Sequence, residues 1–300
     1  MQTLILSGFG TNCERETRYA CERAGAAVGA GPVHVRHISE IYAGGIPLDE
    51  YRFLILIGGF MDGDDLGSGR ACANRFRDRA LPAALGGGTF LDRLRGFIGD
   101  GRLVLGICNG FQVLVKLGLL PGDAEPARGS AAQGGAQTVS LTSNARGRFE
   151  DRWVRLRVDP ASPCVFTRGL ESIELPVRHG EGRIAGRSDE QLAALVEGHL
   201  TPLRYCLPDG APTDAYPANP NGSPYGIASL CNRSGTVLGL MPHPEAFNHF
   251  TNHPQWTRRP APAAEDGDGL ALFRNAYAYL AGQTGRAAGA RSGAAAAVRP

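Results

Sequence analysis

The stretch that decides the fold is Leu103-Val104-Leu105-Gly106-Ile107-Cys108-Asn109-Gly110-Phe111-Gln112. It begins with an aliphatic run over 102–107, of the kind found in strands that are buried on both faces of a parallel sheet. A helical pattern follows at once, over 111–117. The stretch therefore predicts a buried strand, a tight turn with Cys108 at its apex, and a helix.

Aliphatic runs and helical segments alternate on the N-terminal side of this stretch. We expect strands over 3–7, 33–38 and 53–57, and helices over 13–26 and 90–98. Thr11 or Asn12 is expected to cap the first helix. Non-alternating strands separated by helices predict an α/β fold, a doubly wound and mostly parallel sheet with flanking helices. In such a sheet the chemistry is expected at the carboxyl ends of the strands.

The pattern changes beyond about residue 121, where additional β-strands are predicted. These strands are expected over 153–158, 225–230 and 236–241, before a final amphipathic helix over 269–281. Residues 1–281 are therefore expected to form a single domain. Residues 282–300 are rich in Ala, Gly and Arg and have little to bury, which predicts a disordered tail. The initial Met and this tail favour a free subunit.

The composition argues against some classes of binding partner and indicates the cellular compartment. The 300 residues carry 31 basic and 29 acidic side chains, so no net charge favours nucleic acid or an acidic membrane as a partner. No apolar run approaches the roughly 20 residues that cross a bilayer. Seven scattered cysteines without a Cys-x-x-Cys pair predict reduced thiols and a cytoplasmic location.

Cys108 has the sequence context of a nucleophile. A strand that runs through a turn of small residues directly into a helix presents the turn side chain at the helix N-terminus. The helix dipole and the free N–H groups there favour a thiolate, which is the reactive form. The backbone N–H of Asn109 is placed to hold an oxyanion. A buried structural cysteine is the alternative interpretation of Cys108 taken alone.

A general base and its orienting group are found in Met241-Pro242-His243-Pro244-Glu245. Each proline favours extended geometry in the residue before it, and in an extended segment residues two apart project from the same side. His243 and Glu245 are therefore expected to converge, with the carboxylate orienting the imidazole for proton transfer from a thiol. Gly58-Gly59-Phe60, after the third predicted strand, is expected to supply a second oxyanion donor from Gly59.

These three motifs, in this order, resemble a known family. Gly-Ile-Cys-Asn-Gly-Phe-Gln, with Met-Pro-His-Pro-Glu after it and Gly-Gly-Phe before it, is similar to the class I (triad) glutamine amidotransferases, whose sheet is flavodoxin-like. The Cys-Asn-Gly-Phe-Gln variant looks like the glutaminase subunits of phosphoribosylformylglycinamidine synthase, in purine biosynthesis. The motifs at 178–183 and 219–224 resemble that subfamily as well.

The resemblance implies a reaction and a set of roles. Cys108 would attack the side-chain amide of L-glutamine, His243 would transfer protons and Glu245 would orient His243. Gly59 and Asn109 would stabilise the oxyanion, and Gln112 would lie near the bound glutamine. The ammonia would pass to a synthetase subunit, with a small accessory subunit as a possible third component. ATP and Mg²⁺ are expected on that synthetase, and no cofactor or metal on this chain, which lacks a Gly-x-x-x-x-Gly-Lys loop.

Some features depart from the family pattern or stay outside it. The loop after Gly59 reads Phe-Met-Asp-Gly-Asp-Asp, where members more often carry Ser-Tyr-Gly-Asp. His249 and His253 follow His243, but their spacing matches no metal-ligand pattern, so residues 246–253 are interpreted as an extended, partner-facing segment. The six other cysteines lack an accompanying base and are interpreted as structural: Cys13, Cys21, Cys72, Cys164, Cys206 and Cys231.

Two alternatives to the leading interpretation stay open. The first is a triad glutaminase that serves another synthetase, or a cysteine hydrolase of the same fold. The second is a non-catalytic regulatory partner that keeps the fold without turnover. The presence of Cys108, His243 and Glu245 together argues against the second.

Overall fold

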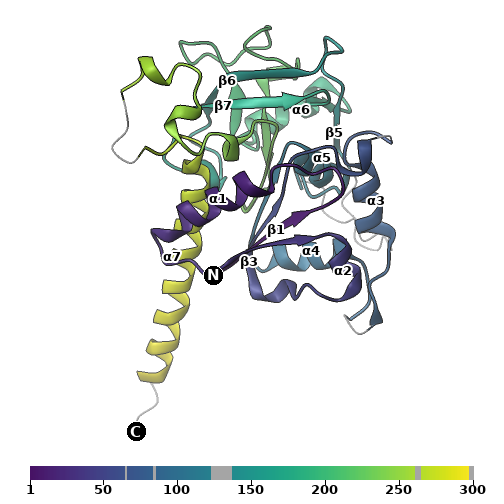
Figure 1. Ribbon diagram of the computed structural model, residues 1–300, viewed down its shortest axis with the longest axis vertical. Helices are drawn as coiled ribbons and strands as arrows, with labels where there is room; N and C mark the ends of the chain where they lie inside the picture. The colour runs from purple at the N-terminus through teal and green to yellow at the C-terminus, as the bar shows by residue number, and fades with distance from the viewer. Residues whose placement is uncertain (65, 84–85, 123–136, 261–264, 297–300) are drawn as a thin grey trace.

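A computed structural model describes residues 1–64, 66–83, 86–122, 137–260 and 265–296 (Figure 1). Its centre is a six-stranded sheet in which all neighbouring strands are parallel except for one antiparallel edge pair. In spatial order the strands are β10 (Ser229–Cys231), β11 (Val237–Leu240), β4 (Leu103–Ile107), β3 (Tyr51–Leu56), β1 (Gln2–Ser7) and β2 (Val33–His37). The mostly parallel α/β sheet predicted from the sequence is confirmed.

Helices cover both faces of this sheet, as the doubly wound fold requires. Phe53 of β3 contacts Tyr277 on one face, whereas the backbone of Leu56, on the opposite face, lies against Gly110. The helices are α1 (Glu14–Ala26), α2 (Ser39–Ala43), α3 (Arg70–Asp78), α4 (Phe90–Gly99), α5 (Asn109–Lys116), α6 (Asp189–Glu197) and α7 (Leu270–Ala296). All five residues of β4 are buried, which is why its sequence shows no alternation.

The second half of the chain adds two small antiparallel sheets, at one end of the molecule (Figure 1). β5 (Val139–Thr142) pairs with β8 (Arg183–Gly186), and β6 (Glu150–Val158) lies between β7 (Ser172–His179) and β9 (Leu203–Tyr205). The predicted alternation in β6 is confirmed, because Val154, Leu156 and Val158 are buried. The additional β-strands expected in this half are therefore present.

Two local predictions were wrong. The N-cap of α1 is Cys13, and neither Thr11 nor Asn12 caps the helix. The Thr11 hydroxyl instead accepts from Gly8 N and donates to Gly8 O and to the side-chain carboxylate of Glu14. The strand predicted to begin at Tyr225 begins only at Ser229, because Tyr225 has a positive φ of 59° and lies in a 3-10 turn. Before α1 and at Tyr225, the residues that the sequence pattern assigned to a helix cap or a strand lie in tight turns.

The last helix is longer than the sequence predicts. α7 continues past Ala281 to Ala296, in a stretch where alanine and arginine favour a helix. Residues 282–296, predicted as a disordered tail, are therefore helical in the structure, and 297–300 lie outside the described residues. Among the described residues, no helix has the length and apolar character needed to cross a membrane.

Candidate active site

Cys108 lies between β4 and α5 in a strained backbone conformation, with φ 50° and ψ −105°. Its N–H donates to the carbonyl of Leu240 in β11, at 2.8 Å, which fixes the turn to the neighbouring strand. The turn needs its glycine at 110, because a Cβ there would lie 2.0 Å from the carbonyl oxygen of Leu56. A positive φ in a non-glycine residue is costly and is found where function requires it. The predicted elbow is therefore present, with a cysteine at its apex.

His243 and Glu245 form a buried pair beside this elbow. The distance between His243 Nδ1 and Glu245 Oε1 is 2.6 Å, and the two residues are 3% and 0% exposed. The convergence predicted from the sequence occurs, but through a 3-10 turn, η6 (Pro244–Ala246), and not through an extended segment. The N–H of His243 also donates to the carbonyl of Pro176 in β7, at 2.8 Å, which holds the turn against the second layer.

The carboxylate decides which imidazole nitrogen carries the proton. Because the Glu245 carboxylate is a hydrogen-bond acceptor, the neutral imidazole of His243 carries its proton on Nδ1, donates it to Glu245 and keeps a lone pair on Nε2. Burial alone lowers the pKa of His243, but the charge of Glu245 and the Cys108 thiol more than offset it, so the pKa stands well above its ordinary value of 6.5. His243 is therefore an effective proton acceptor for a nearby thiol.

In the structure the thiol of Cys108 donates a hydrogen bond to the carbonyl of Arg178, at 3.6 Å. His243 Nε2 has no hydrogen-bond partner within the described parts of the chain, although it is buried. The Cys108 side chain thus rests on the end of β7, and among the described residues His243 Nε2 is left without a partner.

The Gly59 loop is held by the loop that follows β1. Phe60 N donates to Gly10 O at 2.8 Å, and Asn12 N donates to Gly58 O at 3.3 Å. Gly59 has a φ of 138°, and a Cβ there would lie 2.4 Å from Gly10 O, so only glycine fits. Its N–H has no acceptor among the described residues. Asn109 is the first residue of α5, where an N–H lacks an intrahelical acceptor. Both backbone donors named from the sequence are therefore available to an oxyanion.

Gln112 and the Asn109 side chain belong to one buried network. Asn109 Nδ2 lies 2.9 Å from Gln112 Oε1 and 3.2 Å from Asp64 Oδ1, and Gln112 Nε2 donates to the carbonyl of Glu181. Ser68 N donates to the Glu181 carboxylate at 3.3 Å. Gln112 thus ties the elbow helix to the turn between β7 and β8. Its contact with glutamine stays a prediction.

Sequence reasoning missed one side chain that the fold brings to the triad. Cys13, interpreted as structural, places its Sγ 4.0 Å from His243 Nδ1 and is 5% exposed. The two residues are 230 positions apart, so no spacing in the sequence could have paired them. Asp64 was also missed; it lies within the loop whose sequence departs from the family pattern.

The segment after Glu245 is compact and not extended, which corrects the interpretation of residues 246–253. It contains short 3-10 turns, and the His253 ring packs on Trp153 of β6 with centroids 4.6 Å apart. His253 Nε2 lies 3.3 Å from a Glu174 carboxylate oxygen, and His249 pairs with Glu265. The three histidines therefore have separate acidic partners.

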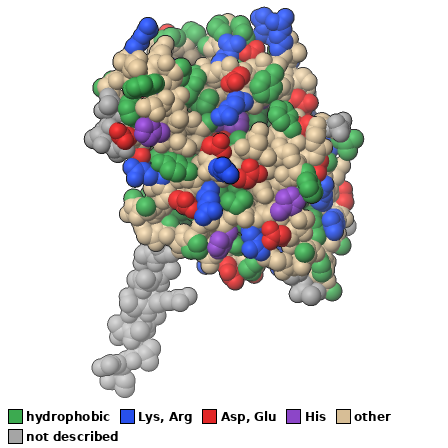
Figure 2. Space-filling view, viewed as in Figure 1, with side chains coloured by type: hydrophobic (Ala, Val, Ile, Leu, Met, Phe, Trp, Pro, Cys, Tyr) green, Lys and Arg blue, Asp and Glu red, His purple; other side chains and the backbone are tan. Residues whose placement is uncertain are grey.

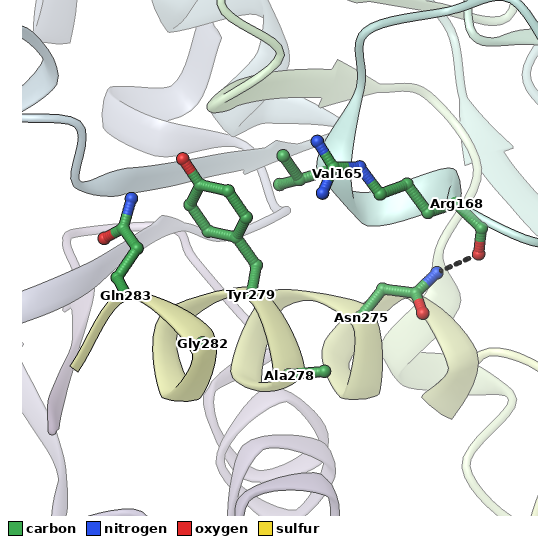
Figure 3. A pocket seen from close by; sticks show the side chains of 7 residues that line it. All are labelled: Val165, Arg168, Asn275, Ala278, Tyr279, Gly282 and Gln283. Carbon is green, nitrogen blue, oxygen red and sulfur yellow. Dashed lines mark hydrogen bonds between the residues drawn. The ribbon is translucent and has the colours of Figure 1, made fainter. Parts of the chain in front are cut away.

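A cavity of about 390 Å³ lies along α7, apart from the triad (Figure 3). Arg168, Asn275 and Tyr279 are among its lining residues, and Asn275 Nδ2 donates to the carbonyl of Arg168 at 2.9 Å. None of its lining residues is a cysteine, a histidine or an acidic residue. On the face shown in Figure 2, acidic and basic side chains are interspersed, as the near balance of charge in the sequence predicts.

Comparisons with known proteins show what the chain is similar to. Residues 1–280 match the model of the CobB/CobQ-like glutamine amidotransferase domain. The phosphoribosylformylglycinamidine synthase subunit PurQ of Dehalococcoides mccartyi is 41% identical over 280 residues, which cover 93% of this chain and 97% of that protein. Human phosphoribosylformylglycinamidine synthase is 37% identical over 281 residues, 91% of this chain and 20% of the human one. A chain in the structure of PurLQS from Thermotoga maritima has a TM-score of 0.61 and 26% identity, over 93% of this chain and 98% of that one.

Proposed function

This chain belongs to the CobB/CobQ-like glutamine amidotransferases, as a PurQ-like glutaminase subunit of phosphoribosylformylglycinamidine synthase, and we propose that Cys108, His243 and Glu245 carry out its hydrolysis of L-glutamine. The observation that carries this assignment of roles is the buried 2.6 Å pair of His243 Nδ1 and Glu245 Oε1. It leaves the Nε2 lone pair free, beside a cysteine that is held at a strained elbow.

In the first half of the reaction, His243 Nε2 takes the thiol proton and Cys108 Sγ attacks the amide carbon of glutamine. The carbonyl oxygen becomes an oxyanion, which the N–H groups of Gly59 and Asn109 stabilise, at about 3–4 kcal/mol for each donor. The imidazolium then returns its proton to the leaving nitrogen. The C–N bond breaks, ammonia leaves, and a glutamyl thioester remains on Cys108.

In the second half a water molecule attacks the thioester, with His243 as the base. A second oxyanion forms against the same two N–H groups and collapses, and the C–S bond breaks. The thiolate regains its proton from His243, and glutamate leaves. The net reaction is glutamine plus water to glutamate plus ammonia, and Glu245 orients His243 in both halves.

We further propose that the ammonia passes to a synthetase subunit. That subunit would bind ATP and Mg²⁺ and convert formylglycinamide ribonucleotide to formylglycinamidine ribonucleotide, with a small accessory subunit completing the assembly. Two comparisons support this partner. The Thermotoga maritima relative is a chain of PurLQS, and the human relative has its likeness to this chain within a much longer polypeptide.

Covalent labelling with a glutamine analogue tests the proposal. The full chain is incubated with 6-diazo-5-oxo-norleucine, with and without the synthetase subunit and ATP, and peptides are mapped by mass spectrometry while glutamate release is assayed. We expect one adduct, on Cys108, that excess glutamine prevents and that Cys108→Ala abolishes. Labelling at another residue, or none with the synthetase and ATP present, would refute the proposed nucleophile.

A further inference from the structure

Three potential metal ligands converge on the side of His243 that faces away from its free nitrogen. Cys13 Sγ, a His243 ring nitrogen and a Glu245 carboxylate oxygen all lie within 4.8 Å of one another. Cys13 Sγ is 4.0 Å from His243 Nδ1, and Glu245 Oε1 is 2.6 Å from it. None of the three residues is more than 5% exposed. The cluster is thus compact, buried and made of three different donor types.

The fold places Cys13 there through the same loop contact that holds the Gly59 loop. Its loop is held to the Gly58 loop by the hydrogen bond from Asn12 N to Gly58 O. A Cβ at residue 58 would lie 2.9 Å from His243 Cε1 and 3.4 Å from Cys13 Sγ. The glycine therefore allows the thiol and the imidazole to approach each other. As the N-cap of α1, Cys13 makes no side-chain capping hydrogen bond.

The donors match the preference of a thiophilic divalent cation. Zn²⁺ is held by cysteine sulfur at about 2.3 Å and by imidazole nitrogen and carboxylate oxygen at about 2.0–2.2 Å. Donor atoms that surround one such ion lie about 3–4 Å apart, so the pair of Nδ1 and Oε1 must open slightly around the ion. A further donor is at hand, because Glu245 Oε2 is buried and has no hydrogen-bond partner among the described residues.

We propose that Cys13, His243 and Glu245 form a binding site for Zn²⁺ or a similar thiophilic cation, which switches off the glutaminase when it is occupied. The ion takes the place of the proton between His243 Nδ1 and Glu245. The Cys13 thiol loses its proton to solvent, and the ring proton displaced from Nδ1 is replaced by one on Nε2, so the imidazole stays neutral. A neutral imidazole with a metal on Nδ1 carries its hydrogen on Nε2. His243 then has no lone pair for the Cys108 proton. This consequence rests on the proposed function, whereas the metal site does not.

Cobalt binding to an inactive variant tests the site without the reaction. Full-length Cys108→Ala is titrated with Co²⁺, and we expect one equivalent to bind with a thiolate-to-cobalt charge-transfer band that Zn²⁺ abolishes. The band should be lost when Cys13→Ala or Cys13→Ser is added, with folding checked by circular dichroism. It should persist when Cys206→Ala is added, since Cys206 lines a separate cavity. The proposal would be overturned if Cys108→Ala showed no band, or if the band persisted after Cys13→Ala or Cys13→Ser was added.

Inhibition provides the second readout. Free zinc is set with a chelator buffer, and the glutamate release of each variant is expressed relative to its own metal-free rate. The zinc concentration that halves this release should be at least about tenfold higher in Cys13→Ser than in the wild type. An unchanged half-inhibitory concentration would mean that zinc acts elsewhere. A metal-free chain that releases no glutamate even with its synthetase would refute the proposed function, and the cobalt titration would still decide whether the site exists.

Discussion

Cys108 and His243 serve the same site, but they are positioned in different ways. The proposed nucleophile is placed mainly by its own neighbours in the sequence: a buried strand, a turn of small residues and a helix set Cys108 at φ 50°. One long-range hydrogen bond, from Cys108 N to Leu240 O, holds the turn. The proposed base has a local partner, Glu245, two residues along the chain, and is also held by distant segments, since His243 bonds to Pro176 of β7 and contacts Cys13 ahead of α1. A short motif can thus build a strained elbow, whereas orienting a base needs the assembled fold.

Removing the nucleophile should have the largest effect. Cys108→Ala is expected to lower kcat for glutamate release by on the order of a millionfold, the loss seen when a hydrolase nucleophile is removed, because no other group forms the thioester. Steady-state assays with the synthetase present measure this. Thermal unfolding should remain cooperative, which separates lost chemistry from lost structure. Retention of even a hundredth of the wild-type rate would rule out the thioester route.

The orienting carboxylate should come next. Glu245→Gln is expected to lower kcat by about 10⁴-fold, because the amide can stabilise the wrong tautomer of His243 and cannot balance an imidazolium charge. The same change removes a charge that raises the pKa of His243, so its pKa falls. The acidic limb of kcat/KM should therefore lie above pH 6.5 in the wild type and move to lower pH in the variant. A limb that does not move would mean that another group limits the rate.

The oxyanion loop should show a smaller effect on rate. In Gly59→Ala the new Cβ would meet Gly10 O at 2.4 Å, so the loop must shift and carry its N–H with it. We expect kcat to fall about 10²- to 10³-fold. Gly29→Ala is the matched control, since its φ is also positive but no atom of the described residues lies within 4 Å of the added Cβ. Equal losses in both variants would point to backbone strain alone.

His179, at the end of β7, tests how far the second layer is coupled to folding. Burial lowers the pKa of His179 to about 3, and its Nδ1 lies 3.1 Å from Asn144 Oδ1. The unfolded chain therefore binds this proton first as the pH falls. Below pH 6.5, and down to about pH 3, the folded state should lose about 1.4 kcal/mol per pH unit from this group. Denaturant titrations should show that His179→Gln removes that part of the slope, and an unchanged slope would contradict the assignment.

The strain at the elbow should give the smallest effect. The Cys108→Gly variant is expected to be more stable than Cys108→Ala, with a free energy of unfolding that is about 1 kcal/mol larger, because glycine adopts a positive φ without a Cβ penalty. Neither variant should be active, so the comparison isolates the backbone. Equal free energies of unfolding for the two variants would show that the turn is not strained, and that the residues next to Cys108 do not force it into an unfavourable conformation.

The sequence alone determined the parallel sheet, the elbow at Cys108 and the convergence of His243 and Glu245, because aliphatic runs, glycines and prolines act on their immediate neighbours. Only the tertiary structure decided the contacts between distant segments: Cys13 beside His243, the Arg178 carbonyl on the Cys108 thiol, and the pairing of His253 with Glu174. It also decided that Cys13, and not Thr11 or Asn12, occupies the N-cap position of α1, where its side chain makes no capping hydrogen bond. Such contacts depend on how layers pack, and packing joins residues whose separation along the chain leaves no periodic signal.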